Sequence, residues 1–553
     1  MDRDGESMES VLMRELTAQE LAERPAEDGF ADPDHVRGLG MSRRELLERG
    51  VYVGVSLSAL GLAFPGRGGA ARAVQSRALK GGTITVAAAQ GIPQLNPITQ
   101  SLVYEKTLFP LLWDGLVEFT PHGGLAPGLA ESWEPSSNLM RWTFKLRKGV
   151  KFHNGKAFTA TDVARTFKYA LGLKTPYDPV SRLGSIKEVR ARGPLVAEFI
   201  LHQPDAILPI ALSELRIIDV DSLKVINKRP NGTGPFKLKA FVPDDHAFVV
   251  RNDAYWGGPA PLDEIRLGKA ADPTAAVTAL RSGDIDVLWS ISNSGAQSLA
   301  KNKDITILKP ATPGQLVILE VDTTSPPFND LRARQALAYA TNRKAILDAA
   351  YFGFGVVSPA NVDIATTDPA YNKALTAYPF DLKKAKDLFA QVGVTKLIYS
   401  SVAGQYPEWR TMGEVLQSDL RKIGVTVDIQ EKEISAWSDI FYPPGKKYPG
   451  LITPNFLSEP PSPFFALNFF KSGRCECNLS DKNTDRLLSK AKATKDAKAR
   501  QKIYNQLQQL VHDNVPDISP LQQFPIAGLR NKVKGAWMLE SGTVYLNHAS
   551  LGA

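Results

Sequence analysis

Between residues 306 and 512, patterns typical of helices alternate with short apolar segments typical of strands. Residues 381–391 have helical spacing and precede Gly393, which suits the left-handed conformation that closes many helices. A short strand at 397–399, a helix at 407–422 and a strand at 425–429 follow in that order. This alternation predicts an α/β fold with a partly parallel sheet that carries helices on its faces.

The rest of the chain is richer in strands than in helices. We expect a strand at 81–87, one continuous helix over 332–350, and a return of the chain to its first domain from Ile518 onward. The length of 553 residues, 43% of them hydrophobic, leaves room for several domains. No internal repeat is visible.

Charge is spread thinly over the sequence. The net charge is +8, and Lys and Arg occur in ones and twos without a polybasic block. This pattern indicates a solvated surface and argues against nucleic acid as a partner.

The first 73 residues have the order of elements typical of an export signal. Arg43 and Arg44 open a Ser-Arg-Arg-x-Leu-Leu pattern, an apolar run occupies residues 50–64, and Ala71-Arg72-Ala73 offers a cleavage site. We therefore expect a leader with a twin-arginine signal at 1–73, use of the twin-arginine export machinery and cleavage near Ala73. A buried helix behind two arginines is the structural alternative, and the start codon could be Met1 or Met41.

This leader predicts a protein that lies in the periplasm of a two-membrane bacterium and is soluble after signal cleavage. A lipid anchor is not expected, because a lipoprotein needs a cysteine at the cleavage site and the first cysteine is Cys475. Cys475 and Cys477 form a C-x-C pair without a nearby His, for which we expect a local disulfide rather than a metal site.

The segment from Trp142 to Val163 resembles a binding site but is interpreted as scaffold. Its first residues alternate as in a strand, Asn154-Gly155 suits a tight turn, and Thr159 with Asp162 nearly matches a helix capping box. The spacing of its glycines does not fit a phosphate-binding loop, and His153 has no second ligand nearby, so it is interpreted as a turn residue.

Catalytic motifs are weak. Neither a G-x-S-x-G elbow nor an H-E-x-x-H helix occurs, and Ser298 with Lys301 forms an isolated S-x-x-K match. A hydrolase that uses this pair is kept as an alternative, but no enzyme activity, catalytic residue, metal or cofactor is predicted.

Several longer motifs, in order, resemble one family. They are PGLAESW at 127–133, WTFKLRKGVKFHNG at 142–155, FTATDV at 158–163, GTGPF at 232–236, RNDAYW at 251–256 and PPFND at 326–330. The chain resembles the family 5 extracellular solute-binding proteins, the dipeptide, oligopeptide and nickel receptors of ABC importers, over nearly all of residues 80–530.

The resemblance implies a periplasmic binding protein-like II fold, an α/β architecture of two lobes and a small extra domain with a hinged cleft. Lobe one would comprise residues 80–116, 227–305 and 515–553, the extra domain 117–226, and lobe two 306–514. The implied function is capture of a peptide or similar polar organic solute by hinge closure and its delivery to a membrane permease, by a protein expected to be a monomer.

Candidate ligand residues follow from their positions near strand ends that would face the cleft. They are Gln90, Asn96 and Tyr104 on lobe one, and Thr312, Gln315, Gln405, Trp409, Asn455, Phe456 and Glu459 on lobe two. Each has a structural alternative, since Tyr104 and Trp409 fit a core and Asn96 precedes a proline in a turn.

One departure from the family affects the choice of ligand. Peptide receptors of the family carry an Asp that pairs with the ligand's ammonium group, and the corresponding position here holds Asn455. The lost charge-assisted bond would weaken binding roughly tenfold to a hundredfold, unless Glu459 reaches the cleft. A peptide stays the leading ligand, with an opine, an oligosaccharide or another non-peptide solute as the alternative; nickel is disfavoured because the seven histidines are scattered.

Overall fold

The structure is a computed structural model that describes residues 81–100, 104–173, 180–270, 272–404, 406–440, 445–458 and 462–552. The predicted leader at 1–73 lies outside the described residues, as do Gln405, Glu459 and the side chain of Phe456. Within the described part of the chain, no helix is both long and apolar enough to cross a membrane.

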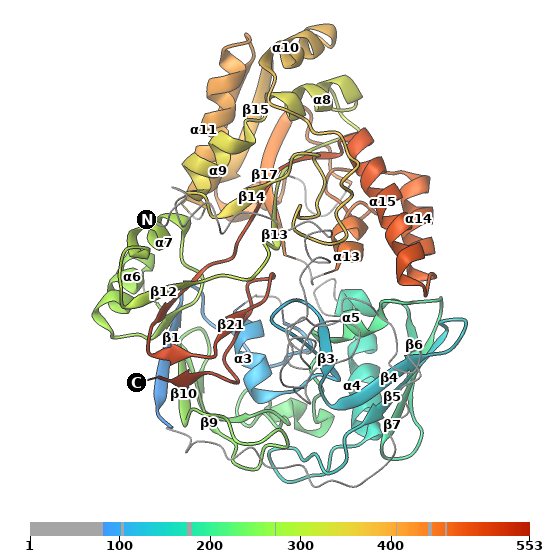
Figure 1. Cartoon of the computed structure of the whole chain (residues 1–553), viewed down its shortest axis with the longest axis vertical. Helices are drawn as coiled ribbons and strands as arrows, with labels where there is room; N and C mark the ends of the chain where they lie inside the picture. The colour runs from blue at the N-terminus through green and yellow to red at the C-terminus, as the bar shows by residue number, and fades with distance from the viewer. Residues whose placement is uncertain are drawn as a thin grey trace, which may run out of the picture. The chain divides into compact units, whose positions relative to one another are not determined.

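A seven-stranded sheet is built around the first described strand (Figure 1). Its strands, in spatial order, are β12 (Ile305–Leu308), β19 (Ala527–Arg530), β11 (Val287–Leu288), β1 (Thr83–Ala88), β10 (Glu264–Lys269), β9 (His246–Arg251) and β8 (Phe236–Val242). β1 pairs in parallel with both β10 and β11, and its residues Ile84 and Val86 are fully buried. Helices α3 (Glu105–Leu112), α6 (Pro273–Ser282) and α7 (Asn293–Leu299) belong to the same region.

A four-stranded antiparallel sheet contains the segment that was interpreted as scaffold. Its order is β4 (Ala130–Pro135), β5 (Arg141–Leu146), β7 (Val196–Leu201) and β6 (Ile186–Ala191); near it are β2 (Val117–Phe119), β3 (Leu125–Pro127), α4 (Ala160–Gly172), α5 (Leu208–Leu212) and two 3₁₀ helices, Val180–Leu183 and Val220–Val225. The capping box of Thr159 and Asp162 at α4 is confirmed. His153 is bonded to residues 232–234, with 3.1 Å from its Nε2 to the Gly234 carbonyl, so the structure uses it to hold the turn.

A six-stranded mixed sheet confirms the predicted α/β alternation. Its order is β14 (Gly355–Val357), β18 (Asp517–Gln523), β13 (Gln315–Val321), β17 (Leu451–Ser458), β15 (Lys396–Val402) and β16 (Thr426–Lys432). β15 is parallel to both β16 and β17, whereas β13 is antiparallel to its two neighbours. Its helices are α8 (Leu331–Ala340), α9 (Arg343–Tyr351), α10 (Leu382–Gln391), α11 (Pro407–Arg421), α12 (Ile434–Ser438), α13 (Pro463–Asn468), α14 (Lys482–Lys492) and α15 (Ala497–Asn514).

The two faces of this sheet pack against different cores, as the alternation along β13 shows. Val317, Leu319 and Val321 join the core that includes residues of α8 to α11. Leu316 and Ile318 point the other way, into a core formed with α13, α14 and α15. That second core also contains Ile207 and Ala211, from the segment around α5. We call this side of the six-stranded sheet the α15 face.

Two expectations about elements were wrong. The helix expected over 332–350 is interrupted, because Thr341 is extended and the Asn342 side chain accepts a bond from the Ala345 amide to begin α9. Ile518 lies in β18, which pairs with β13, so the chain returns to the first sheet only at β19. The remaining strands form two short pairs, β20 (Val533–Lys534) with β23 (Ser550–Leu551) and β21 (Trp537–Met538) with β22 (Val544–Tyr545).

Candidate functional site

The α15 face carries polar side chains among its apolar ones. Residues directly opposite each other on paired antiparallel strands point to the same side of a sheet. Opposite Leu316, Ile318 and Glu320 of β13 lie, respectively, Gln522 of β18, Asn455 of β17 and Asp517 of β18. Asn455, a predicted ligand residue, therefore shares a buried face with two carboxylates and a second amide.

Asn455 and Glu320 are hydrogen-bonded to each other. The Asn455 side-chain amide donates to Glu320 Oε1 over 3.0 Å, and Glu320 is 0% exposed. The second carboxylate oxygen of Glu320 is buried without a hydrogen-bond partner. The structure thus places a carboxylate beside the position at which the family resemblance predicts an Asp.

Three further buried carboxylates lie around Glu320. They are Asp363, Glu476 and Asp517, which with Glu320 we call the acidic cluster; all four are at least nine-tenths buried. None of the four forms an ion pair with a described Lys, Arg or His, although the charge of Arg474 lowers the pKa of Glu476. Both side-chain oxygens of Asp517 lack a hydrogen-bond partner.

The electrostatics of the acidic cluster follow from burial and repulsion. Burial raises the pKa of Glu320 well above its usual range, and the charges of Glu476 and Asp363 raise it further. Burial likewise raises the pKa of Asp363 and that of Glu476 to about 7. The pKa of Asp517 is also raised well above its usual range, by burial first and then by Asp363 and Glu320. Each carboxylate therefore makes ionisation of the cluster more costly.

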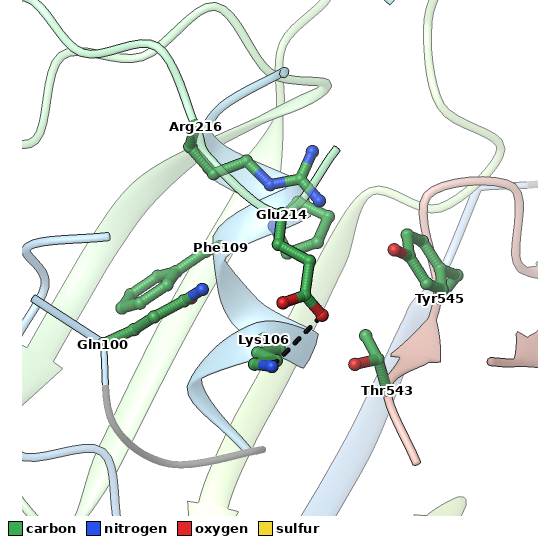
Figure 2. Close-up of a pocket in the computed structure, with 8 residues that line it drawn as sticks. Gln100, Lys106, Phe109, Glu214, Arg216, Thr543 and Tyr545 are labelled. Atoms are coloured by element: carbon green, nitrogen blue, oxygen red, sulfur yellow. Dashed lines mark hydrogen bonds and ion pairs between the residues drawn. The ribbon is translucent and has the colours of Figure 1, made fainter. Parts of the chain in front are cut away.

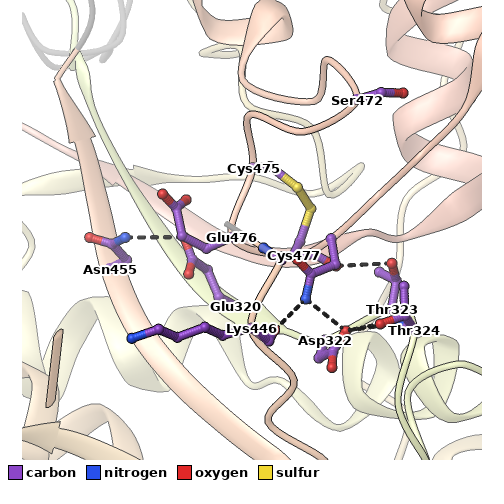
Figure 3. Close-up of a disulfide and its surroundings, with 12 residues drawn as sticks. Glu320, Asp322, Thr323, Thr324, Lys446, Asn455, Ser472, Cys475, Glu476 and Cys477 are labelled. Carbon is purple, nitrogen blue, oxygen red and sulfur yellow. Dashed lines mark hydrogen bonds between the residues drawn. A yellow bond between two sulfur atoms is a disulfide. The ribbon is translucent and has the colours of Figure 1, made fainter. Parts of the chain in front are cut away.

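The predicted disulfide is confirmed, and it encloses one member of the acidic cluster. Cys475 and Cys477 are bonded, with Glu476 between them, beside Glu320 and Asn455 (Figure 3). The Tyr448 hydroxyl donates to the Glu476 carbonyl over 2.7 Å, and the Thr323 amide donates to the Cys477 carbonyl over 2.9 Å. These bonds fix the backbone from which the Glu476 side chain extends.

Thr312 and Gln315 lie at the passage from β12 into β13. The Thr312 hydroxyl donates to the Glu540 carboxylate, and Gln315 accepts a 2.9 Å bond from Gln523. Burial raises the pKa of Glu540 to about 7, Asp368 adds to this increase, and the bond from Thr312 opposes it. The structure therefore ties this passage to the C-terminal segment.

The three residues nominated in the first sheet region differ in their surroundings. Gln90 is exposed just after β1. Asn96 accepts a bond from the Ile98 amide over 3.1 Å and donates to Tyr169 over 3.0 Å, which agrees with its structural alternative as a turn residue. Tyr104 is buried against Trp289, with ring centroids 5.1 Å apart, and its hydroxyl lacks a hydrogen-bond partner. These residues do not join the acidic cluster.

Trp409 and Ser298 have local roles in the structure. Trp409 is 2% exposed and packs between Tyr406 and Trp437 in the core of α8 to α11, as its structural alternative states. The Ser298 hydroxyl donates to the Gly295 carbonyl of its own helix over 2.7 Å. This bond does not support a serine nucleophile.

A small pocket lies at α3, where Lys106 and Glu214 form a 3.1 Å ion pair (Figure 2). Its volume is about 10 Å³, which fits roughly one water molecule. Burial alone would raise the pKa of Glu214, but the charges of Lys106 and Arg182 lower it to about 2. Each charged residue that lines this pocket has an ion-pair partner, in contrast to the carboxyls of the acidic cluster.

Two local features of the sequence indicate the acidic cluster. Glu320 interrupts the apolar run LVILEV of β13, and Glu476 stands between the two cysteines. A charged residue in a strand that is otherwise buried is unusual unless it has a partner. Asp363 and Asp517 carry no comparable local signal.

Comparisons with known proteins agree with this fold. The model of the bacterial extracellular solute-binding proteins, family 5 Middle, matches residues 124–475, more than half of the chain. The chain belongs to this family. It is therefore a solute-binding protein of a transport family and not a member of an enzyme family.

Individual relatives cover most of the chain. The heme-binding protein A of Haemophilus influenzae is 28% identical, over 77% of this chain and 84% of its own length. The dipeptide-binding protein of Escherichia coli is 29% identical, over 80% and 89%. The structure of the ABC transporter-associated periplasmic binding protein DppA from Helicobacter pylori, in complex with the peptide STSA, has a TM-score of 0.73 at 24% identity and covers 86% of this chain and 98% of its own. These findings confirm the predicted fold class.

Proposed function

We propose that the protein captures a peptide or a similar polar organic solute in the periplasm and delivers it to the permease of an ABC importer. Membership of the family, shown over residues 124–475, carries the proposal. Relatives named for dipeptide binding, and a fold neighbour that holds a peptide, support the choice of solute.

The solute is proposed to bind between the two lobes outlined by the family resemblance, and closure of the lobes is proposed to retain it. Closure is favoured only by the difference in affinity of the solute for the closed and open states. Two of the predicted ligand residues, Thr312 and Gln315, lie at the passage between the two large sheets. A third, Asn455, is hydrogen-bonded to Glu320 of the acidic cluster.

Glu320 favours a solute with a free amine over an uncharged one. The Glu320 carboxyl, bonded to Asn455, supplies the acidic group that Asn455 itself lacks, and a bound ammonium group would favour its ionised form. An oligosaccharide offers no ammonium group to this carboxylate, and an opine remains the second candidate because it combines an amine with further polar groups.

Calorimetry and thermal unfolding of the purified protein test the proposal. Peptides, opines, sugars and amino-acid derivatives are titrated one class at a time. A genuine solute stabilises the protein by about 2.7 kcal/mol at a hundred times its dissociation constant. If no class binds, the proposed function is wrong.

Export by the twin-arginine machinery, with cleavage near Ala73, is proposed from the sequence pattern alone. The double variant Arg43→Lys, Arg44→Lys is expected to stay in the cytoplasm, as measured by cell fractionation. Arg37→Lys, which lies before the pattern, is the matched control and is expected to be exported. Normal periplasmic amounts of the double variant would exclude this route.

A further inference from the structure

The α15 face contains more buried carboxyl groups than the described cations near it pair with. Glu320, Asp363, Glu476 and Asp517 come from four separate parts of the chain, and all are at least nine-tenths buried. Buried carboxylates in native proteins are usually paired with a cation or hydrogen-bonded. Here one oxygen of Glu320 and both oxygens of Asp517 lack a hydrogen-bond partner, whereas Asp363 lies near the Ser519 hydroxyl, which lowers its pKa.

The region around the cluster is also short of hydrogen-bond partners. Gln522 is 2% exposed, and neither its amide nitrogen nor its amide oxygen has a partner. Its register opposite Leu316 places it on the same sheet face as Glu320 and Asp517. The Gln522 amide lies on the same face as these carboxyls, at the level of Leu316 rather than that of Glu320, and its unmet hydrogen bonds indicate that a polar molecule completes this region.

Among the residues that the structure describes, no Lys, Arg or His forms an ion pair with the cluster. Arg474 acts on Glu476 alone among the four carboxyls, and Arg343 donates to the carbonyls of Ser358, Ala338 and Tyr378 and to the Asn361 side chain. Asn361 in turn donates to the Asp517 backbone carbonyl, not to its carboxylate. Lys446, which lies near Glu320 (Figure 3), donates its ammonium group to the Asp439 carbonyl over 2.7 Å. Asp322 is negative and raises the pKa of Tyr448 together with Glu320, Glu476 and Asp517.

The arrangement suits an organic cation better than a metal ion. Among the described residues, no three His, Cys, Asp or Glu side chains converge closely enough to hold a metal. The carboxylates are instead spread over β13, β18, the disulfide loop and the segment after β14. Ammonium and guanidinium groups, with several donors each, can bridge carboxylates separated in this way.

Two parts of the chain cover the α15 face: α13 to α15, and the segment around α5. Ile207 and Ala211, near α5, pack in the same core as residues of α13 to α15. Movement of the segment that carries Ile207 and Ala211 away from α13 to α15 would uncover part of this core.

We propose that the acidic cluster is a subsite for an organic solute that carries at least two ammonium or guanidinium groups. The inference rests on the proposed function, because it names the chemical class of the solute that the protein captures. Glu320, held by Asn455, binds one cationic group, and Asp517 with Asp363 binds the second. Gln522 contributes an amide to the polar part of the solute.

Calorimetric titration of the purified protein tests the inference with matched probes. The probes are the dipeptides Lys-Lys, Ala-Ala and Glu-Glu, together with spermidine and agmatine, so that a basic peptide and a polyamine are distinguished. At least one dicationic probe is expected to bind about tenfold or more tightly than Ala-Ala. Stronger binding of Lys-Lys would assign a basic peptide, and stronger binding of spermidine or agmatine would assign a polyamine.

Variants that replace a carboxyl by an amide of the same shape test whether this binding takes place at the acidic cluster. Glu320→Gln and Asp517→Asn are each expected to weaken binding of the dicationic probe by at least about tenfold. The same variants are expected to raise the melting temperature of the free protein, because each removes an ionisable carboxyl whose burial is costly. Glu433→Gln, at an exposed position at the start of α12, is the control and is expected to change neither quantity.

Contrary results separate the two levels of the hypothesis. Equal or tighter binding of Ala-Ala, or unchanged binding in both Glu320→Gln and Asp517→Asn, would overturn the cationic subsite and leave the solute-binding function intact. Failure of every peptide, opine, sugar and amine to bind would overturn both.

Discussion

At the scale of single residues, ionisation of buried carboxyls links stability to pH. Burial raises the pKa of Asp363 to about 7, whereas in an unfolded chain it would be about 3.9. Between these values the native state binds more protons than the unfolded state, so the contribution of Asp363 to the free energy of unfolding falls as pH rises.

Asp363→Asn is therefore expected to gain stability relative to the wild type as pH rises from about 4 to about 7. The gain at pH 7 is expected to be on the order of 4 kcal/mol, measured by urea denaturation at a series of pH values. Asp284→Asn, at an exposed position, serves as the control and should show no such trend. A difference between Asp363→Asn and wild type that does not change with pH would show that Asp363 is ionised in the folded protein.

Trp409 is a second residue whose role can be separated from ligand binding. Because it packs in the core between Tyr406 and Trp437, Trp409→Ala is expected to lower the free energy of unfolding by about 3–5 kcal/mol. The folded fraction should still bind the solute with wild-type affinity in calorimetry. A large loss of affinity without a loss of stability would instead assign Trp409 to the binding surface.

At the scale of elements, the passage from β12 to β13 has little tolerance for added atoms. A Cβ on Gly314 would lie 2.2 Å from Glu540 Cβ and 2.6 Å from its carbonyl oxygen. Gly314→Ala is expected to cost about 1–3 kcal/mol, measured by thermal and urea unfolding.

Gly172, the last residue of α4, provides the matched control for this substitution. No atom lies within 4 Å of a Cβ placed there, so Gly172→Ala is expected to be neutral or stabilising by up to about 1 kcal/mol. Equal effects of the two substitutions would show that the contact between Gly314 and Glu540 does not constrain the passage.

Local elements could be predicted from the sequence because their signals are local. The capping box at α4 and the helix ended by Gly393 depend on residues within a few positions of one another. The break between α8 and α9 was missed because Asn342 begins a new helix inside a pattern that continues across it. The pairing of β18 was missed because it depends on the partner strand β13, about 200 residues earlier.

The candidate site was harder to predict for the same reason. Asn455 could be nominated from the family resemblance, but the acidic cluster joins positions 320, 363, 476 and 517, which only the fold brings together. A buried Glu in an apolar strand indicates a polar partner without saying which one. The sequence therefore predicts that Asn455 belongs to the candidate site, but it does not predict which charged residues surround Asn455.

At the scale of the whole molecule, contacts between distant segments determine how readily the α15 face opens. The Ala206 amide donates to the Lys492 carbonyl over 2.7 Å, and the Lys492 ammonium group lies 3.1 Å from Asp205. Ile207 adds an apolar contact with the core of α13 to α15. Under the proposed closure, these contacts stabilise the state that retains the solute.

Ile207→Ala is expected to shift this equilibrium toward the open state. Apparent affinity falls in proportion to the population of the competent state, so roughly a threefold to thirtyfold loss is expected in calorimetry. Small-angle scattering should show a larger radius of gyration for the free variant than for the free wild type. Ile186→Ala, which removes the same atoms from the core beside β6, should lose stability but keep the wild-type affinity. If both variants lose affinity equally, the effect comes from general destabilisation and not from the contact at Ile207.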